Sequence, residues 1–274
     1  MAQNNKSLGQ HWLRDRSILN QIASLALPDQ QPLLGADTAS SEALQPASQL
    51  LPSSNPPLCL EIGPGLGTLT SSLLRLFPKV IAVEFDAKLA HNLPGSFPGK
   101  NLTVVHQDFL KFDLSTITEA YVVAANIPYY ITSPIINKLL STPHPPQKIV
   151  LLIQKEVAER IVANPGHHTY LSLSVQNSAT ATLGPIVPRQ LFTPPPKVDS
   201  QVLILHPHPP LLSESVLRFA KHGFSNPRKK LIKNLPYPKS VLDAVFSKLQ
   251  LDPNLRPAAL SHQDWQRLAA LLAR

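Results

Sequence analysis

Short apolar runs alternate, between residues 58 and 163, with segments whose apolar residues recur at helical spacing. The runs are too short for buried helices and rich in β-branched residues, which favours strands. The predicted strands cover residues 58–62, 80–84, 102–105, 122–125 and 148–154. The predicted helices cover residues 68–77, 87–93, 134–140 and 155–163. Strands that alternate with helices predict an α/β protein with a doubly wound, mostly parallel sheet and right-handed crossovers.

Other segments lack this regular alternation. Residues 28–57 are rich in Pro, Gln, Ser and Ala and predict a mobile surface insertion, with a short helix over residues 41–51. Residues 171–182 predict one or two further strands. The proline-rich residues 192–200 predict a rigid bend before a last strand over residues 202–205.

Both ends of the chain show helical spacing. Residues 6–27 predict a loop followed by an amphipathic helix. The prolines within residues 206–210 predict a linker, which divides the chain into a larger domain (1–206) and a small helical domain (207–274). The predicted helices of the small domain cover residues 216–222, 228–235, 240–249 and 263–272.

Composition restricts the class of protein. A chain of 274 residues can bury one sizeable core and a smaller second one. Its one cysteine, Cys59, excludes an intrachain disulfide framework and fits a reducing compartment. No apolar stretch approaches the ~20 residues of a membrane helix, and the first ten residues lack an apolar signal core. We expect a cytoplasmic monomer that does not associate with membranes.

The net charge of +8 is concentrated at the C-terminal end. Residues 206–274 carry eleven Lys or Arg against four Asp or Glu, whereas the preceding residues are nearly neutral. A basic region of this kind predicts contact with a polyanion, with nucleic acid the leading candidate. A solvated charged helix face remains the alternative. The candidate phosphate-binding residues are Arg218, Lys221, Arg228, Lys229, Lys230 and Lys233.

A glycine loop follows the first buried strand and precedes a helix, as in nucleotide-binding proteins. Its spacing, Gly63, Gly65 and Gly67, differs from the Gly-x-Gly-x-x-Gly that cradles a dinucleotide pyrophosphate, and Pro64 removes one backbone donor. The loop therefore favours a cofactor that needs close backbone approach without strong anion binding. S-adenosyl-L-methionine, a nucleoside with a sulfonium and an amino acid, fits this description.

Acidic residues stand at the ends of the next two strands. Glu84 could bind both ribose hydroxyls of the cofactor, and Asp108 could accept from its adenine amine. Either residue could instead cap a helix or lie on the surface. Because the carboxyl ends of parallel strands meet at one edge of a sheet, the two acids and the glycine loop predict a single site.

The strand over residues 122–125 ends in Asn126, Ile127, Pro128 and Tyr129. An adenine amine carries two in-plane N–H donors, which the Asn126 oxygen and the Ile127 carbonyl could accept while Tyr129 stacks on the ring. Phe192 is a candidate second stacking face. The alternative is an ordinary strand-ending turn. Methyl transfer from a sulfonium is an in-line displacement, so the site needs positioning but no metal. The histidines lack metal-ligand spacing.

Together these residues resemble the ribosomal RNA adenine N6,N6-dimethyltransferases, specifically the enzymes that dimethylate two adjacent adenosines near the 3′ end of small-subunit RNA. The matching stretches are residues 8–15, 60–70, 83–86, 107–108, 126–134, 154–157, 192–200, Phe224 and 228–230. The resemblance implies a class I, Rossmann-like methyltransferase fold, a role in ribosome biogenesis and a C-terminal domain that grips RNA within an assembling small subunit. It also implies that His11, Leu13, Gly63, Glu84, Asp108 and Asn126 line the cofactor site.

The sequence departs from the family in several places. His11 and Trp12 replace the usual Asn-Phe, although an imidazole could still donate to the methionine carboxylate. The insertion at residues 28–57 is longer than usual, Leu171 follows Tyr170 where the family has glycine, and Pro227 interrupts the basic motif. The alternatives are the related 23S RNA enzyme of macrolide resistance and a non-catalytic assembly factor. Residues 192–200 favour the small-subunit enzyme, and the glycine spacing disfavours a nicotinamide oxidoreductase.

Overall fold

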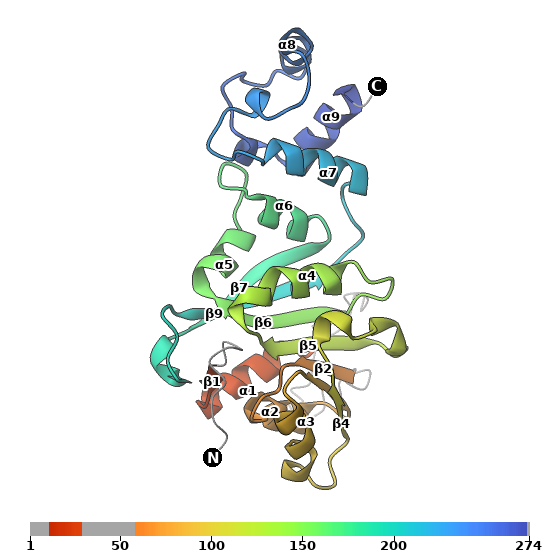
Figure 1. Ribbon diagram of the computed structural model, residues 1–274, viewed down its shortest axis with the longest axis vertical. Helices are drawn as coiled ribbons and strands as arrows, with labels where there is room; N and C mark the ends of the chain where they lie inside the picture. Colours follow the sequence, from red (N-terminus) through yellow and green to blue (C-terminus); the bar gives the residue numbers. More distant parts are fainter. Residues whose placement is uncertain (1–10, 29–57, 273–274) are drawn as a thin grey trace, which may run out of the picture.

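A computed structural model describes residues 11–28 and 58–272 (Figure 1). The strands of its main sheet are β2 (Leu58–Ile62), β3 (Val80–Glu84), β4 (Leu102–His106), β5 (Tyr121–Asn126), β6 (Lys148–Gln154), β7 (Ala179–Val187) and β9 (Ser200–Pro207). Their order across the sheet is β4-β3-β2-β5-β6-β9-β7. The strands from β4 to β6 are parallel, whereas β9 pairs antiparallel with β6 and β7. The predicted mostly parallel sheet is confirmed.

The chain reverses its direction across the sheet between β2 and β5. From β2 it proceeds through β3 to β4, and it then returns to place β5 and β6 on the other side of β2. Such a reversal leaves a crevice beyond the carboxyl ends of the strands, where ligands bind in open α/β sheets. The glycine loop and Asn126 follow the two strands at this point.

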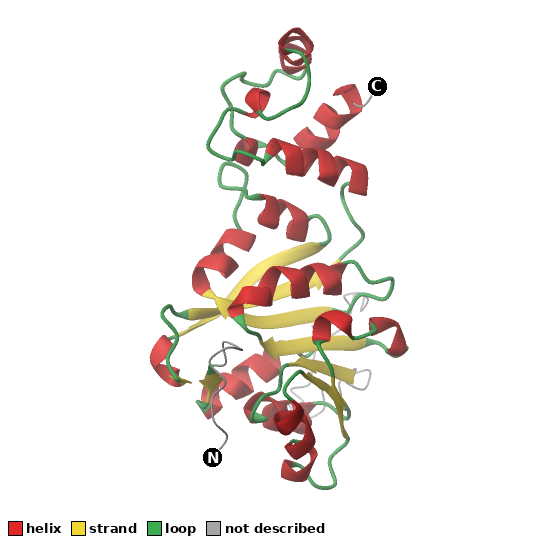
Figure 2. Cartoon of the chain, viewed as in Figure 1, coloured by secondary structure: helices red, strands yellow, loops and turns green. Residues whose placement is uncertain are grey.

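Helices cover both faces of the sheet (Figure 2). Val122 packs with α1 (Arg16–Leu25) and α2 (Thr68–Leu76), and its neighbour Val123 packs with α4 (Thr132–Leu140) and α5 (Lys155–Ile161). Successive side chains of a strand point to opposite faces, so a strand buried on both faces reads as a continuous apolar run. The helix α3 (Ala87–Asn92) connects β3 to β4.

A small second sheet connects distant segments. β1 (Trp12–Leu13) pairs antiparallel with β8 (Phe192–Thr193), and Leu13 lies opposite Phe192. Both residues are buried in the core beneath α1 and α2. The pairing fixes the N-terminal segment beside the proline-rich bend and so brings His11 to the crevice.

The C-terminal end consists of α7 (Glu214–Gly223), α8 (Lys239–Lys248) and α9 (His262–Leu272), at the top of Figure 1. They pack around the fully buried Trp265, together with Leu173 of α6 (Tyr170–Gln176). Gly223 permits this packing, because an added Cβ would lie 2.3 Å from the Trp265 ring. The expected helical C-terminal region is present. The division of the chain at residues 206–210 stays a prediction.

Two expectations were wrong. Residues 171–176 are helical, because Thr169 and Ser172 form a reciprocal capping box at the start of α6. Only β7 in this part of the chain is a strand. Residues 228–235 form turns and the short 3₁₀ helix Leu231–Lys233, held by the Asn234 amide, which donates to the carbonyls of Gly223 and Asn226. The predicted insertion at 28–57 and its helix over 41–51 lie outside the described residues, apart from Pro28.

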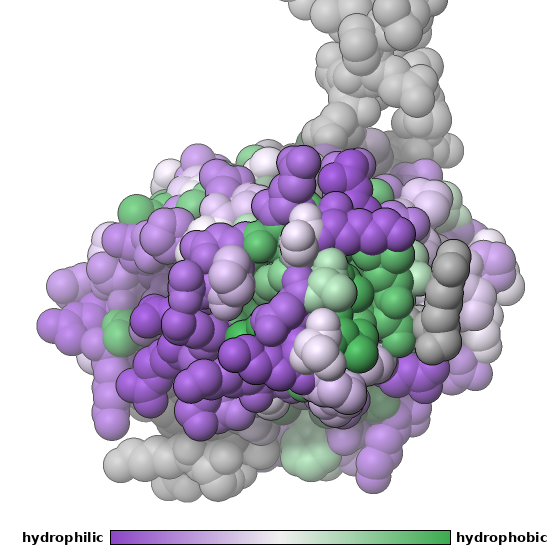
Figure 3. Space-filling view, turned by 90° about the horizontal axis from the view of Figure 1, so that it is seen from above, coloured by the Kyte–Doolittle hydropathy of each residue, from purple (hydrophilic) through white to green (hydrophobic). Residues whose placement is uncertain are grey.

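Hydrophilic residues cover most of the end formed by the C-terminal helices and surround a hydrophobic area (Figure 3). A groove between the ends of α8 and α9 combines apolar residues with two cations, Lys248 and Arg267.

Within the described ranges, no helix is both long and apolar enough to cross a bilayer. Within the part of the chain that the structure describes, the other 3₁₀ helices are Pro94–Ser96, Phe109–Lys111, Leu114–Thr116, Tyr129–Ile131, Arg189–Leu191 and Pro257–Ala259.

Candidate active site

A cavity of about 380 Å³ lies in the crevice at the carboxyl ends of β2 to β5. Its walls bring together most of the predicted site residues: His11, Gly63, Gly65, Glu84, Asp108, Asn126, Ile127, Pro128 and Tyr129. Leu13, Gly67 and Phe192 do not line it. Phe192 is 3% exposed and packs in the core, so its position does not support the expected second stacking face.

The three glycines of the loop all have positive φ, but their surroundings differ. At Gly63 (φ 65°) an added Cβ would meet nothing within 4 Å, which leaves the backbone open to a ligand. At Gly67 (φ 77°) an added Cβ would lie 2.7 Å from Leu93 and 2.9 Å from Phe97. Gly63 thus allows a cofactor to approach the backbone closely. Gly67 instead leaves room for the side chains of Leu93 and Phe97, which follow α3 (Ala87–Asn92).

Glu84 is 5% exposed and holds the glycine loop in place. Its Oε2 accepts from the Gly65 amide at 2.9 Å, and its Oε1 accepts from the Asp86 amide at 2.8 Å. Each carboxylate oxygen can accept a second hydrogen bond. A carboxylate fixed in this way can bind two neighbouring hydroxyls of a ribose without reorientation.

Asp108 has the capping role that the sequence left as an alternative. Its Oδ1 accepts from the Leu110 amide at 2.9 Å and caps the 3₁₀ helix Phe109–Lys111. The residue also lines the cavity, at the end of the strand next to the one that carries Glu84. Capping therefore fixes the carboxylate at the cavity wall and leaves acceptor capacity for an amine.

The orientation of the Asn126 side chain follows from its partner. Its Nδ2 donates to the backbone carbonyl of His11 at 3.1 Å. A carbonyl oxygen can only accept, so the amide nitrogen must face His11 and the amide oxygen is directed elsewhere. Asn126 lines the cavity, where this oxygen can accept a hydrogen bond from a planar amine.

The Tyr129 side chain is held by contacts of its hydroxyl group and of its ring. Its hydroxyl forms a 2.8 Å hydrogen bond with Ser200, and its ring stacks on His11 with centroids 6.0 Å apart and planes at 23°. Burial raises the pKa of the Tyr129 phenol above its ordinary value, so the group is neutral at physiological pH. The ring is a fixed wall of the cavity.

His11 is oriented by the proline-rich bend. Its Nδ1 lies 2.8 Å from the carbonyl oxygen of Pro194, which can only accept, so Nδ1 carries the proton. In the neutral ring, Nε2 is then an acceptor. Donation from the imidazole to a cofactor carboxylate, as the sequence suggested, therefore requires the charged ring.

Sequence reasoning missed Glu61, which lines the cavity and is 1% exposed. Its Oε2 has no hydrogen-bond partner among the described residues. Burial raises the pKa of Glu61 to about 8; Thr70 counteracts this and the Glu84 carboxylate adds to it. The available signal was an acid inside the apolar strand before the glycine loop. A cationic ligand in the cavity would stabilise its ionised form.

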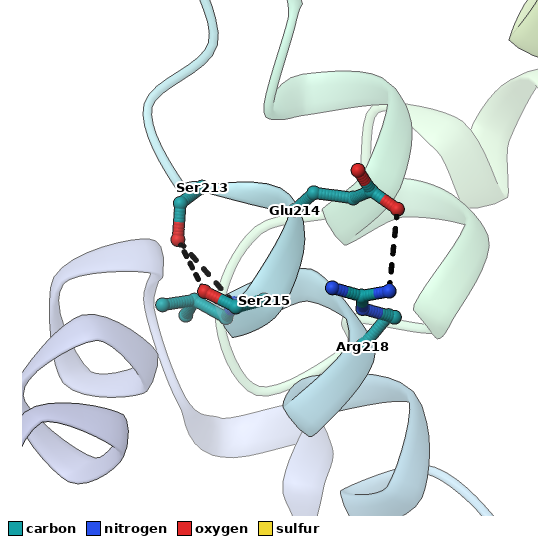
Figure 4. Close-up of polar contacts among 5 residues, drawn as sticks. Ser213, Glu214, Ser215 and Arg218 are labelled. Carbon is teal, nitrogen blue, oxygen red and sulfur yellow. Dashed lines mark hydrogen bonds and ion pairs between the residues drawn. The ribbon is translucent and has the colours of Figure 1, made fainter. Parts of the chain in front are cut away.

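The six candidate phosphate-binding residues are all exposed on the C-terminal part of the chain. Arg218 on α7 pairs with Glu214 at 3.7 Å, beside the serines that begin the helix (Figure 4). Lys230 donates to the side chain of Asn254. Among the described residues, no group of three or more His, Cys, Asp or Glu could hold a metal ion.

Comparisons with known proteins agree with this geometry. The family model for ribosomal RNA adenine dimethylase matches residues 1–274. The chain is 38% identical to "Ribosomal RNA small subunit methyltransferase A" of Rippkaea orientalis, over 99% of this chain and 98% of that protein. It resembles the crystal structure of a dimethyladenosine transferase from Plasmodium falciparum, with 27% identity, a TM-score of 0.72 and coverage of 96% and 98% of the two chains.

The structure of the 23S rRNA methyltransferase ErmE is similar at 26% identity, with a TM-score of 0.68 and coverage of 96% of this chain and 100% of that one. Both likenesses confirm the expected methyltransferase fold. Over its whole length the chain therefore belongs to the ribosomal RNA adenine dimethylase family, whose enzymes take methyl groups from S-adenosyl-L-methionine.

Proposed function

We propose that the protein transfers methyl groups from S-adenosyl-L-methionine to N6 of two adjacent adenosines near the 3′ end of small-subunit ribosomal RNA. The product is N6,N6-dimethyladenosine, made during assembly of the subunit. The observation that carries the proposal is the fixed Asn126 amide, whose oxygen is free to accept at the wall of a cavity that also contains the Tyr129 ring. Relatives named as small-subunit methyltransferases support the choice of RNA.

The cofactor residues fit a nucleoside that bears a cationic amino acid. Glu84 and Asp108 offer acceptors to ribose hydroxyls and an amine, and Gly63 lets the ligand approach the backbone closely. Glu61 offers an unpartnered carboxylate oxygen to a positive charge. The bound cofactor supplies an electrophilic methyl group on its sulfonium. The protein does not need to generate one.

The remaining residues act on the target base. Its amine is a weak nucleophile, because its lone pair is delocalised into the ring. Acceptance of the amine protons by the Asn126 oxygen and the Ile127 carbonyl would localise that pair, while Tyr129 holds the ring in line for displacement. Pro128 fixes the backbone between these groups. No side chain is assigned as a general base.

The C-terminal part is proposed to hold the RNA. Exposure of Arg218, Lys221, Arg228, Lys229, Lys230 and Lys233 supports contacts with phosphates, which position RNA without reading its sequence. We further propose that the protein acts as a cytoplasmic monomer, with residues 207–274 as a helical, basic RNA-binding domain. Light scattering during size-exclusion chromatography tests the monomer.

The decisive experiment offers labelled S-adenosyl-L-methionine with naked 16S RNA, assembling small subunits and 23S RNA. Dimethyladenosine only in the small-subunit substrates is expected. Label in 23S RNA would instead indicate a 23S rRNA methyltransferase, as ErmE is. Absence of label in all substrates would indicate a non-catalytic assembly factor. The Asn126→Ala variant, expected to be inactive, shows that any label comes from this site.

A further inference from the structure

Large apolar side chains are exposed at the mouth of the cavity. Seven such side chains are exposed among the described residues, and three of them line the cavity: Phe85, Leu110 and Tyr130. Single exposed apolar residues are common on protein surfaces, but a group at the mouth of a binding site indicates a contact surface. Tyr130, at 65%, is the most exposed of the seven.

The sheet order separates Tyr130 from the other two. Phe85 and Leu110 follow the neighbouring strands β3 and β4, next to the acids Glu84 and Asp108. Tyr130 follows β5, which is separated from β3 by β2. Phe85 and Leu110 therefore border the part of the cavity that fits the cofactor nucleoside. Tyr130 borders the part formed by Asn126 and Tyr129.

Local hydrogen bonds fix the backbone at Tyr130 and so place the residue at the mouth of the cavity. Tyr130 is the middle residue of the 3₁₀ helix Tyr129–Ile131, in which successive side chains point about 120° apart. The Ile131 amide donates to the Pro128 carbonyl at 3.3 Å, and the Thr132 hydroxyl donates to the Tyr129 carbonyl at 3.0 Å. One ring thus forms the wall of the cavity, and the next faces solvent beside it.

We propose that Tyr130 stacks on the base adjoining the adenosine held by Asn126. An adenosine that enters the cavity leaves the stack of its own strand, and its neighbour loses a stacking partner. Aromatic side chains replace such partners in single-stranded RNA recognition. With two adjacent target adenosines, Tyr130 would hold one of them while the other is methylated. This inference rests on the proposed function and identifies a second nucleotide that the same site contacts.

The test combines removal of the Tyr130 ring from the protein with removal of one adenine base from the RNA. The wild-type protein and Tyr130→Ala are compared on small-subunit RNA, free or in assembling particles, whichever the wild type methylates. Two further RNAs replace one or the other adenosine with an abasic residue by ligation of a synthetic 3′ segment. The KM of the wild type and of Tyr130→Ala is measured for each RNA. Cofactor affinity is measured from the change in tryptophan fluorescence, which Trp12 reports because it lines the cavity and Trp265 does not.

On intact RNA, loss of the ring should raise KM roughly ten-fold. On at least one abasic RNA, the ratio of the KM of Tyr130→Ala to that of the wild type should fall to about one. The base on which Tyr130 would stack is already missing from that RNA. Tyr130→Phe should behave like the wild type, and so should Ile186→Ala, which removes an exposed apolar side chain from β7 that does not line the cavity. Cofactor affinity should not change in any of these variants.

An unchanged KM for Tyr130→Ala on intact RNA would overturn the stacking role. An equal rise on intact RNA and on both abasic RNAs would also overturn it, because the ring would then contact something other than the adjoining base. If the wild type methylates no form of small-subunit RNA, the proposed function itself fails and the inference fails with it.

Discussion

The amide nitrogen of Asn126 donates to the backbone carbonyl oxygen of His11, across 115 residues of sequence. This bond decides which end of the amide enters the cavity. It also makes a two-residue strand at the N-terminus part of the catalytic geometry, because β1 holds His11 in place.

Asn126→Asp should abolish methyl transfer although it preserves shape. An ionised carboxylate cannot donate to the His11 carbonyl, and repulsion would turn the side chain away from it. We expect kcat to fall by at least about 10²-fold, with cofactor affinity changed only a few-fold. Methyl-transfer kinetics and Trp12 fluorescence measure the two quantities. Asn137→Asp, at an exposed position on α4, is the matched control. Comparable turnover in the Asn126 and Asn137 variants would refute the assignment.

Gly63→Ala and Gly67→Ala should separate cofactor binding from folding. Both substitutions place a side chain at positive φ, at a cost of roughly 1–2 kcal/mol. Gly63→Ala should retain most of its stability and lose cofactor binding, because the new methyl group faces open space at the cavity. Gly67→Ala should lose more stability through its contacts with Leu93 and Phe97. Urea unfolding and cofactor titration test the pair, and the reverse ranking in stability would contradict it.

Glu61 should make the cofactor-free protein less stable as pH rises. The pKa of Glu61 is about 8 in the folded protein against an ordinary value of 4.5. Between these pH values the folded protein retains a proton that the unfolded chain has released. The free energy of unfolding therefore falls with rising pH, by at most ~1.4 kcal/mol per pH unit.

The Glu61→Gln variant should lose this slope and be more stable than the wild type near pH 8. Melting temperatures between about pH 5 and pH 9 provide the measurement. Glu156→Gln, at an exposed position on α5, should keep the wild-type slope. Parallel curves for the wild type and Glu61→Gln would show that Glu61 is ionised throughout.

His262 should destabilise the C-terminal helices in acid. Burial lowers the pKa of His262 below its ordinary value of 6.5, and His168 and His208 lower it further, against the opposing effect of the Leu173 carbonyl. Below about pH 6.5 the unfolded chain takes up a proton that the folded protein resists, so stability is lost as pH falls. His262→Gln should reduce this loss, and His222→Gln, at an exposed position, should not. Unfolding followed by Trp265 emission at pH 7.5 and pH 5.5 distinguishes them.

Basic residues of the C-terminal part should contribute unequally to RNA affinity. Lys229→Gln should weaken binding and reduce the slope of log K against log salt by nearly one, as expected for one lost phosphate contact. Arg218→Gln should change the slope less, because Glu214 already pairs with Arg218. Lys79→Gln, which removes a lysine paired with Glu119, is the control. Equal slopes for Lys229→Gln and the wild type would remove Lys229 from the interface.

Local pattern was sufficient for the five parallel strands and for the residues that follow them. Apolar runs identify β2, β3, β5 and β6 because burial on both faces requires mostly apolar residues in them. The edge strand β4 is only partly buried, and its β-branched residues identify it. The same reasoning failed at α6, where Leu171, Leu173 and Val175 alternate with polar residues as in a strand. There the cap at Thr169 determines the structure.

Contacts between distant segments could not be predicted in this way. An apolar residue such as Phe192, beside prolines, is equally consistent with a stacking face and with the core. Only its pairing with Leu13 decides in favour of the core. Glu61 could have been found, because an acid inside an apolar strand is costly unless it has a function. The orientation of Asn126 depends on a backbone carbonyl, which no sequence pattern specifies.

Leu173 has a consequence for protein engineering. This residue belongs to a helix that precedes β7 and β9, yet its side chain completes the core around Trp265. A fragment that starts after β9 would therefore lack one wall of its own core. An exchange of C-terminal regions between relatives, intended to change the RNA that is recognised, would have to carry α6 along or match its surface.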